Sequence, residues 1–239
     1  MEQNLQKHIA QTLEGINPRL TRRTISAEKW SMEEMLSQIV SFGRTLNRNF
    51  RLDEHNREVY TNIVYWAMGD ARMKAVNPST GKIIQGRVDK GLYIAGNVGT
   101  GKTTAMQIAT QLYKLNPFRK PWQQDTIAEN MVYRASDIVN GYEVEGYAKI
   151  VDIARCGYLV IEDLGTEPGE AVFMGNRRNV LRQLMENRGD VQSYAMSATS
   201  NIPLGHPDFI SRYGQRAQSR VQEMTNYLVL TGDDRRKVL

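Results

Sequence analysis

One stretch of this 239-residue sequence has the residue types and the spacing needed to hold a phosphate chain. Residues 96–103 read Gly-Asn-Val-Gly-Thr-Gly-Lys-Thr and match the pattern G-x-x-x-x-G-K-[ST] at every fixed position. Glycines let the backbone curl until successive amides face a phosphate, and the start of the following helix adds a favourable dipole. A glycine-rich turn with an incidental lysine is the alternative, but a predicted strand before the motif and a predicted helix after it favour a nucleoside-triphosphate site.

The residues of this site have separate predicted roles. Lys102 reaches the β- and γ-phosphates, the Thr103 hydroxyl binds Mg²⁺, and Thr104 lies near the α-phosphate. The predicted nucleotide-binding residues are Gly96, Asn97, Val98, Gly99, Thr100, Gly101, Lys102, Thr103 and Thr104.

Two carboxylates end the clearest buried strand of the sequence, residues 158–163, which read Tyr-Leu-Val-Ile-Glu-Asp. They are expected at the carboxyl edge of a parallel sheet, beside the glycine-rich loop. There one acid can hold the water shell of a metal ion while the other polarises an attacking water. The usual order in such ATPases is Asp followed by Asp or Glu, whereas here Glu162 comes first and Asp163 second. The sequence leaves open which of the two serves Mg²⁺, and a strand end merely solvated by two acids is the alternative.

Composition places the chain among soluble proteins with a substantial core. Lys and Arg number 31, Asp and Glu number 26, the formal charge is +5, and 41% of residues are hydrophobic. No run approaches the roughly 20 apolar residues of a membrane span, and the first residues form no apolar signal segment. The single cysteine, Cys156, excludes an intramolecular disulfide framework and a cysteine-based zinc cluster. A cytoplasmic protein without a membrane partner is expected, and the charge permits a polyanionic partner without requiring one.

The element pattern changes near residue 85. Before it the sequence predicts helices, one of them starting at the capping box of Ser31 and Glu34, followed by a linker over residues 77–90. After it strands alternate with helices, which indicates an α/β fold with a parallel sheet covered on both faces. The predicted strands are 92–95, 131–133, 158–161, 193–196 and 227–230, and the predicted helices are 102–114, one from Ser136 or Asp137, 174–187 and 212–224. We therefore predict a helical partner-binding domain over residues 1–85 and a nucleotide-binding domain over 86–239.

Three ordered segments carry a family resemblance. Residues 161–168, Ile-Glu-Asp-Leu-Gly-Thr-Glu-Pro, resemble the segment after the acidic strand in DnaC-type replicative-helicase loaders of the AAA+ class. Residues 198–201, Ala-Thr-Ser-Asn, resemble their sensor-1 element, and residues 212–220 resemble their arginine-finger helix. The resemblance covers roughly residues 91–236, and the first 85 residues match only in general character. It implies a P-loop AAA+ core.

This resemblance implies further site residues. Asn201 would orient the attacking water or contact the γ-phosphate, although an asparagine that starts a turn before Pro203 is the alternative. Arg220 is the first choice for an arginine finger offered to the nucleotide of a neighbouring subunit. Arg212 and Arg216 precede it at four-residue intervals, so the three can share a helix face, and one of them can simply pair with an acid or face solvent.

Length refines the expected class. After the last predicted strand only residues 231–239 remain, which is too short for the helical lid of many AAA+ proteins. Arg235 and Arg236 are therefore expected to belong to a solvated tail rather than to act as a sensor-2 pair. A lidless core behind a small helical domain resembles both helicase loaders and the related IstB transposition ATPases.

Other basic and aromatic residues have less specific readings. The stretch Arg19–Arg23, with Arg44, Arg48 and Arg51 downstream, can contact DNA phosphates or an acidic partner, or can simply face water. Trp30, Trp66 and Trp122 are expected as core or interface anchors, and Cys156 as a buried thiol.

The resulting functional hypothesis is an ATPase, using ATP and Mg²⁺, that loads a hexameric replicative helicase onto single-stranded DNA. It would act as a homo-oligomer with ATP at subunit boundaries, its N-terminal helices docking the helicase. An IstB-like ATPase that guides a transposase is the first alternative. A nucleotide-gated adaptor with feeble hydrolysis stays open because of the Glu162-Asp163 order. A small-molecule phosphotransferase is disfavoured because residues 142–155 contain one arginine, and the lack of an N-K-x-D motif disfavours a Ras-like GTPase.

Overall fold

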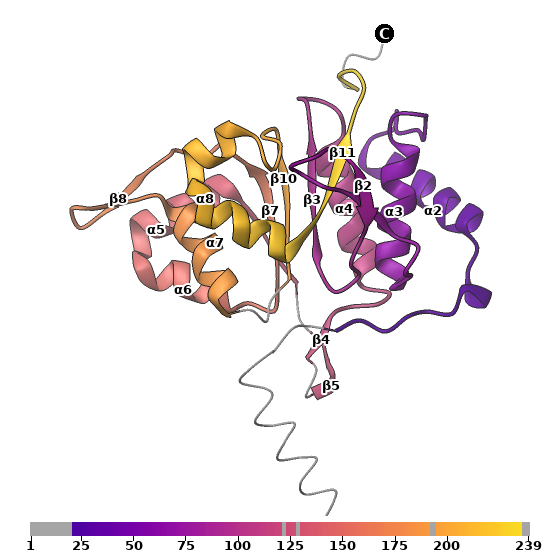
Figure 1. The fold of residues 1–239 in the computed structure, drawn as a ribbon, viewed down its shortest axis with the longest axis horizontal. Coiled ribbons are helices and arrows are strands. Elements are labelled where there is room, and N and C mark those ends of the chain that lie inside the picture. The colour runs from indigo at the N-terminus through magenta and orange to yellow at the C-terminus, as the bar shows by residue number, and fades with distance from the viewer. Residues whose placement is uncertain (1–20, 121–122, 128–129, 192–194, 236–239) are drawn as a thin grey trace, which may run out of the picture.

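A five-stranded parallel sheet forms the centre of the computed structural model, which describes residues 21–120, 123–127, 130–191 and 195–235. The strand order is β11-β3-β10-β7-β6 (Figure 1). The strands are β3 (Gly91–Gly96), β6 (Asn130–Arg134), β7 (Tyr158–Leu164), β10 (Met196–Ser200) and β11 (Thr225–Leu230). Because all neighbours run parallel, the carboxyl ends of β3, β7 and β10 meet at one edge.

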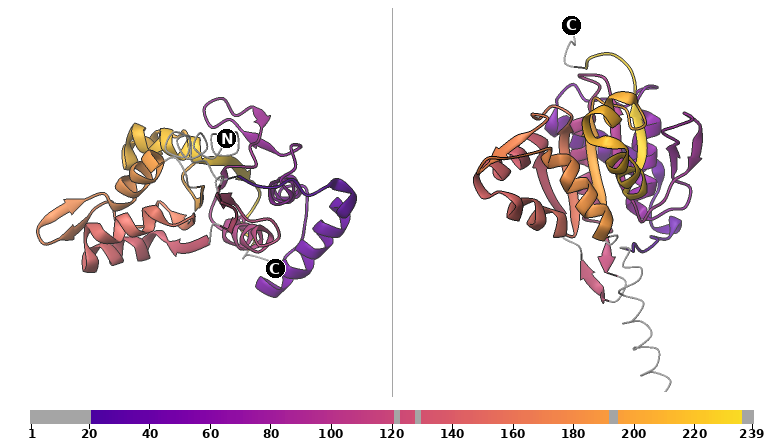
Figure 2. Two further views of the ribbon diagram at one scale, coloured as in Figure 1. Left: turned by 90° about the horizontal axis from the view of Figure 1, so that it is seen from below. Right: turned by 60° about the vertical axis from the view of Figure 1, so that its left-hand side comes forward.

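Helices cover both faces of this sheet, as the sequence predicts. One layer consists of α2 (Met32–Leu46), α3 (Arg57–Met68) and α4 (Lys102–Tyr113). The other consists of α5 (Ala135–Glu145), α6 (Tyr147–Arg155), α7 (Val180–Val191) and α8 (Pro207–Met224). The two layers lie on opposite sides in Figures 1 and 2.

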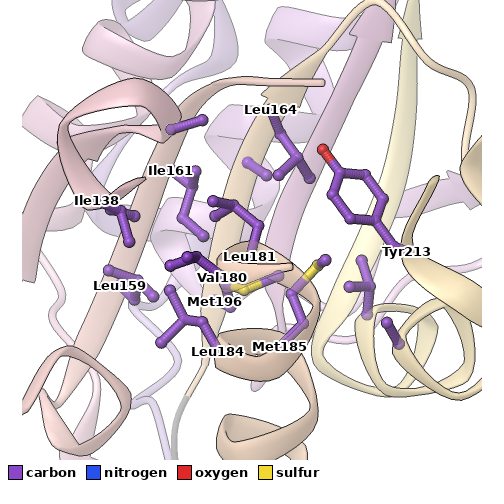
Figure 3. Close-up of a cluster of buried hydrophobic side chains, with 14 of the residues drawn as sticks. Ile138, Leu159, Ile161, Leu164, Val180, Leu181, Leu184, Met185, Met196 and Tyr213 are labelled. Carbon is purple, nitrogen blue, oxygen red and sulfur yellow. The ribbon is translucent and has the colours of Figure 1, made fainter. Parts of the chain in front are cut away.

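Side-chain alternation along the strands assigns each residue to one layer. Leu92 and Ile94 of β3 pack with the α2–α4 layer, whereas Tyr93 and Ala95 pack with the α5–α8 layer. Figure 3 shows the second cluster, where Leu159 and Ile161 of β7 meet side chains from α5 and α7. The short apolar runs of the sequence are therefore strands buried on both faces.

The N-terminal helices share a core with the sheet. The Ser31 side chain accepts a hydrogen bond from the Glu34 amide at 3.1 Å, which confirms the predicted helix start. Trp66 of α3 is fully buried, and its ring stacks with that of Tyr113 of α4 at 6.4 Å between centroids. The domain boundary at residue 85 stays a prediction. The helices α2 and α3 before it and the sheet after it pack into one apolar cluster.

Three hairpins occur where the sequence predicts other structure or none. β1 (Lys74–Val76), just before the predicted linker, pairs with β2 (Ile83–Gln85) inside it, and β4 (Arg119–Lys120) pairs with β5 (Gln123–Ile127). Asn77 explains the first turn, because its side chain accepts from the amides of Ser79 and Thr80. β8 (Ala171–Phe173) and β9 (Asn176–Arg178) form a hairpin that projects from the body (Figures 1 and 2).

Two predicted boundaries are wrong because of local turn geometry and side-chain capping. The helix predicted from residue 174 begins at Val180, since Gly175 turns the β8–β9 hairpin at φ 81° and Asn179 caps the helix by accepting from the Arg182 amide at 3.0 Å. The strand predicted over 193–196 is β10, which starts at Met196, and residues 192–194 lie outside the described part.

Arg22, in the N-terminal basic stretch, does not have the predicted environment. It packs against aromatic rings, whereas the sequence suggested contact with solvent or DNA. Its guanidinium lies 4.0 Å from the Trp66 ring centroid and 4.2 Å from that of Phe118. Its Nη1 donates to the Trp66 carbonyl, and burial lowers the pKa of Arg22 to about 10. Arg22 is thus a packing residue. Arg44, Arg48 and Arg51 are exposed as predicted, whereas Arg19 and Trp122 lie outside the described residues.

The remaining expectations concern one aromatic residue, the thiol and membrane insertion. Trp30 is partly buried against the α2–α4 layer, and burial raises the pKa of the partly buried Cys156 thiol. Among the described residues, no helix combines the length and the apolar character needed to cross a membrane.

Candidate nucleotide-binding site

The glycine-rich loop joins the end of β3 to the start of α4, the context that the motif requires. Gly99 and Gly101 have φ values of 79° and 94°, which residues with a Cβ rarely adopt. Gly96 packs against β11 so closely that a Cβ there would lie 2.4 Å from the Leu230 carbonyl oxygen. The glycines therefore have two roles. Gly99 and Gly101 permit the curl of the loop, and Gly96 lets the loop lie against β11.

Lys102 is already directed along the loop. Its Nζ donates to the carbonyl oxygens of Gly96 at 2.9 Å and Asn97 at 2.8 Å, and the residue is 8% exposed. The Thr100 hydroxyl also donates to the Asn97 carbonyl, at 2.9 Å. These bonds hold the loop around the lysine, with the Lys102 ammonium at the start of α4.

A cleft of about 600 Å³ opens over the loop and brings together most of the predicted site. Asp163 from the end of β7 and Asn201 from the end of β10 line it, opposite the loop. The other lining residues are Leu46, Asn47, Asn49, Phe50, Asn56, Tyr60, Val98, Gly99, Thr100, Gly101, Lys102, Thr103, Thr104, Thr166 and Arg235. Gly96 and Asn97 do not line the cleft, and they take part through their carbonyl bonds to Lys102.

A bulge in β7 separates the two predicted carboxylates. Ile161 pairs with Ala198 and Leu164 with Ser200, so Glu162 and Asp163 together oppose the single residue Thr199. Asp163 has a φ of 56°, and its amide donates to Thr199 Oγ1 at 2.9 Å. Asp163 lines the cleft, while Glu162 is not among the lining residues.

The environment of Glu162 disfavours its charged form. Burial raises the pKa of Glu162, the Asp163 carboxylate raises it further, and Arg134 on the adjacent strand opposes both effects. The two acids therefore differ in position, since only Asp163 lines the cleft.

Asn201 is held in place by the turn that follows β10. The Ser200 hydroxyl donates to the Leu164 carbonyl at 2.6 Å and accepts from the Ile202 amide at 2.9 Å. These two bonds tie the turn to the end of β7. The exposed Asn201 side chain is thereby placed at the cleft, on the strand next to Asp163.

The predicted finger arginines do not line the cleft. Arg216 and Arg220 pair with Asp190, at 2.9 and 2.8 Å, and Arg220 also pairs with Glu223 at 3.2 Å. Arg216 and Arg220 share a helix face as predicted.

Arg212 does not share that face and pairs with an acid instead, which is the alternative that the sequence left open for one of the three arginines. Gly214 interrupts α8 with φ 83° and ψ 158°, and before this kink Arg212 pairs with the buried Glu167 at 3.1 Å. A glycine inside an otherwise helical pattern was the available signal for the break.

Two walls of the cleft have no counterpart in the predicted site. The end of α2, the start of α3 and the segment between them contribute six lining residues, from Leu46 to Tyr60. The C-terminal segment crosses the loop, where the Arg235 amide donates to the Gly99 carbonyl at 2.9 Å and its Nη2 donates to Asp53 Oδ1 at 2.8 Å. The prediction that Arg235 lies in a solvated tail is therefore wrong, and Arg236 lies outside the described residues.

The fold matches that of solved AAA+ proteins. The alignment with the DnaC helicase loader covers 78% of this chain and 96% of that chain, at 18% identity and a TM-score of 0.51. The DnaI structure aligns over 79% and 88% at 16% identity (TM-score 0.48), and domain III of the Thermotoga maritima replication initiation protein DnaA over 77% and 65% at 17% (TM-score 0.48). No protein-family profile and no curated protein sequence matches the chain. The predicted AAA+ architecture and the resemblance to DnaC-type proteins are thus confirmed at the level of the fold.

Proposed function

We propose that this chain is an ATPase that binds ATP in the 600 Å³ cleft and hydrolyses it at the boundary between two subunits. The observation that carries the proposal is the convergence of the loop, Asp163 and Asn201 on one cleft from three parallel strand ends. In sheets of this kind ligands bind outside the carboxyl ends of the strands.

The residues of the cleft fit a triphosphate and its metal ion. The amides of the loop and the α4 N-terminus bind phosphate oxygens, and Lys102 exchanges its two carbonyl partners for the β- and γ-phosphates. The Thr103 hydroxyl and the Asp163 carboxylate are the groups that hold Mg²⁺, which neutralises charge on the phosphates when bound. We assign the metal to Asp163 rather than Glu162 because Asp163 lines the cleft and Glu162 does not.

Three further side chains, with Arg216 beside the last of them, complete the reaction. Asn201 orients the attacking water from the strand next to Asp163. Glu162, with its raised pKa, accepts the proton of that water after a rotation toward the cleft. Arg220, with Arg216 beside it, leaves Asp190 and stabilises the transition state in the neighbouring subunit.

The cellular role that we propose is loading of a hexameric replicative helicase onto single-stranded DNA. The fold shared with the DnaC helicase loader supports this role, together with the order of the acidic, sensor-like and arginine-bearing segments. In this proposal residues 1–85 dock the helicase, residues 86–239 form the ATPase, and the exposed Arg44, Arg48 and Arg51 supply contacts to DNA phosphates.

ATP turnover with and without single-stranded DNA tests the enzymatic proposal. Lys102→Ala is expected to lower turnover by about 100-fold, because it removes a charge from the transferred phosphate. Lys114→Ala, at the exposed C-terminal end of the same helix, is the matched control and should retain turnover. Equal turnover in the wild type and Lys102→Ala would remove the ATPase assignment.

Purification of the tagged protein from an extract of its own host tests the cellular role. We expect a replicative helicase in the eluate, retained with ATP and reduced for a variant that lacks residues 1–85. Recovery of a transposase instead would replace helicase loading by an IstB-like role. Recovery of neither would overturn helicase loading and leave the ATPase assignment to the turnover assay.

A further inference from the structure

Glu167 is a buried carboxylate to which the sequence assigns no role. Its side chain is 2% exposed, and both of its oxygens accept hydrogen bonds. Oε2 accepts from the Gly165 amide at 2.8 Å, while Oε1 accepts from the Tyr213 hydroxyl at 2.6 Å and from Arg212 Nε at 3.2 Å. Arg212 Nη2 donates to the Glu167 backbone carbonyl as well. A carboxylate this well satisfied holds its partners in one geometry.

These partners belong to two segments, the turn after β7, which contains Gly165, and α8, which contains Arg212 and Tyr213. On one side, Thr166 lines the cleft, and its amide and hydroxyl bond to the Asp163 carbonyl at 3.2 and 2.8 Å. On the other side, Arg212 and Tyr213 form the last turn of α8 before the kink at Gly214. In Figure 3 the Tyr213 side chain reaches from α8 toward Leu164 at the end of β7. Glu167 thus connects the turn after the acidic strand to the first half of α8.

The second half of α8 carries the finger arginines, and α7 contacts both halves of the helix. Asn179, which caps the start of α7, donates from Nδ2 to the Arg212 carbonyl at 2.7 Å. Asp190 near the end of α7 pairs with Arg216 and Arg220. The kink therefore divides α8 into a half fixed to the cleft by Glu167 and a half that presents the arginines.

We propose that Glu167 is a positioning residue for the arginine finger, acting on the ATP of the neighbouring subunit rather than on its own. This inference rests on the proposed trans action of Arg220. By fixing Arg212 and Tyr213 against the end of β7, Glu167 sets where the helix enters the Gly214 kink, and so where Arg216 and Arg220 point. A purely structural role would weaken a subunit equally as acceptor and as donor of the finger.

Mixed assemblies separate these two roles. Lys102→Ala subunits donate a finger but have about 100-fold lower turnover of their own, and Arg220→Ala subunits hydrolyse ATP only with a donated finger, so their mixture should regain turnover. Glu167→Gln is then added to the donor alone or to the acceptor alone, with single-stranded DNA present. We expect at least a fivefold loss of the regained turnover in the donor and less than a twofold loss in the acceptor.

Tyr213→Phe provides a milder second variant, and Tyr158→Phe is its matched control. Each substitution removes one hydroxyl from a buried tyrosine that makes a 2.6 Å hydrogen bond, to Glu167 or to Ser197. Thermal unfolding of each variant checks that losses of stability are similar. Only Tyr213→Phe should lower donor turnover, and this comparison decides the matter if Glu167→Gln does not fold.

The outcomes distinguish the inference from the function beneath it. Equal losses in donor and acceptor, or equal behaviour of the two tyrosine variants, would overturn the positioning role of Glu167 and leave the trans finger intact. A reference mixture that regains no turnover at any ratio would overturn the trans finger itself, and the positioning role with it.

Discussion

Arg188 offers a quantitative test of how the strands that carry the site are held together. Its side chain is fully buried on α7, and its guanidinium donates to four backbone carbonyls. Nη1 reaches the carbonyls of Ala154 and Cys156 at 3.1 and 2.9 Å, at the end of α6. Nη2 reaches those of Gly157 and Ala195 at 3.2 and 2.6 Å, just before β7 and β10. One side chain therefore joins the two strands that end at Asp163 and Asn201.

Arg188→Met should lower the free energy of unfolding substantially. Hydrogen bonds to a charged donor contribute about 1.5–3 kcal/mol each. The simple sum over four such bonds is larger than the loss of stability that we expect. The sum overshoots because the substitution also removes the desolvation penalty of a buried guanidinium and because bonds in one network are not additive. We expect a net loss of about 3–5 kcal/mol, the range for removing one partner of a buried charged interaction.

Urea unfolding followed by circular dichroism measures this loss, and Arg182→Met is the matched control. Arg182 lies on the same helix, is about half exposed and pairs with Glu186 at 3.0 Å. An exposed pair of this spacing contributes about 0.3–0.5 kcal/mol. If Arg188→Met and Arg182→Met differ by less than about 1 kcal/mol, the four carbonyl bonds do not hold the strands together and the reasoning fails.

The remaining predictions concern the walls and the acids of the cleft. Arg235→Gln removes the ion pair with Asp53 and a positive charge from the cleft, so the Kd for ATP should rise about tenfold. Arg48 is exposed and does not line the cleft, so Arg48→Gln should leave the Kd unchanged. Isothermal titration of both variants with ATP measures the two Kd values. Because burial and Asp163 raise the pKa of Glu162, its ionised form costs stability above that pKa, and the cost disappears as pH falls. Glu162→Gln should therefore raise Tm near neutral pH and lose this advantage toward about pH 4, whereas a Tm difference independent of pH would refute it.

Features encoded within a few neighbouring residues were predictable from the sequence. The phosphate-binding loop depends on glycines and a lysine within eight positions, and its conformation follows from what those residue types permit. The Ser31 cap and the buried strands on either side of the site are likewise local patterns, and they reappear in the structure. The parallel sheet followed from their alternation with helices, since that order allows few topologies.

Local patterns failed where one turn or one glycine altered the geometry. The β8–β9 hairpin replaced the first part of a predicted helix, and the kink at Gly214 moved Arg212 away from the other two arginines. In both cases a residue with positive φ, at 175 or 214, broke a periodicity that the flanking residues suggested. The β7 bulge is similar, because no local pattern in the sequence marks the register shift against β10 at Glu162 and Asp163.

The tertiary structure alone decided which distant segments complete the cleft. Asp53 and Arg235 are 182 residues apart, and their pairing beside the loop depends on α2 and α3 packing against the sheet. Arg22 looked like a solvated basic residue, yet aromatic rings from three separate segments enclose it. The sequence by itself determined that the chain carries a phosphate-binding loop followed by an acidic strand end. Which of the two acids lines the cleft, and which distant residues line it with the loop, required contacts that no local pattern encodes.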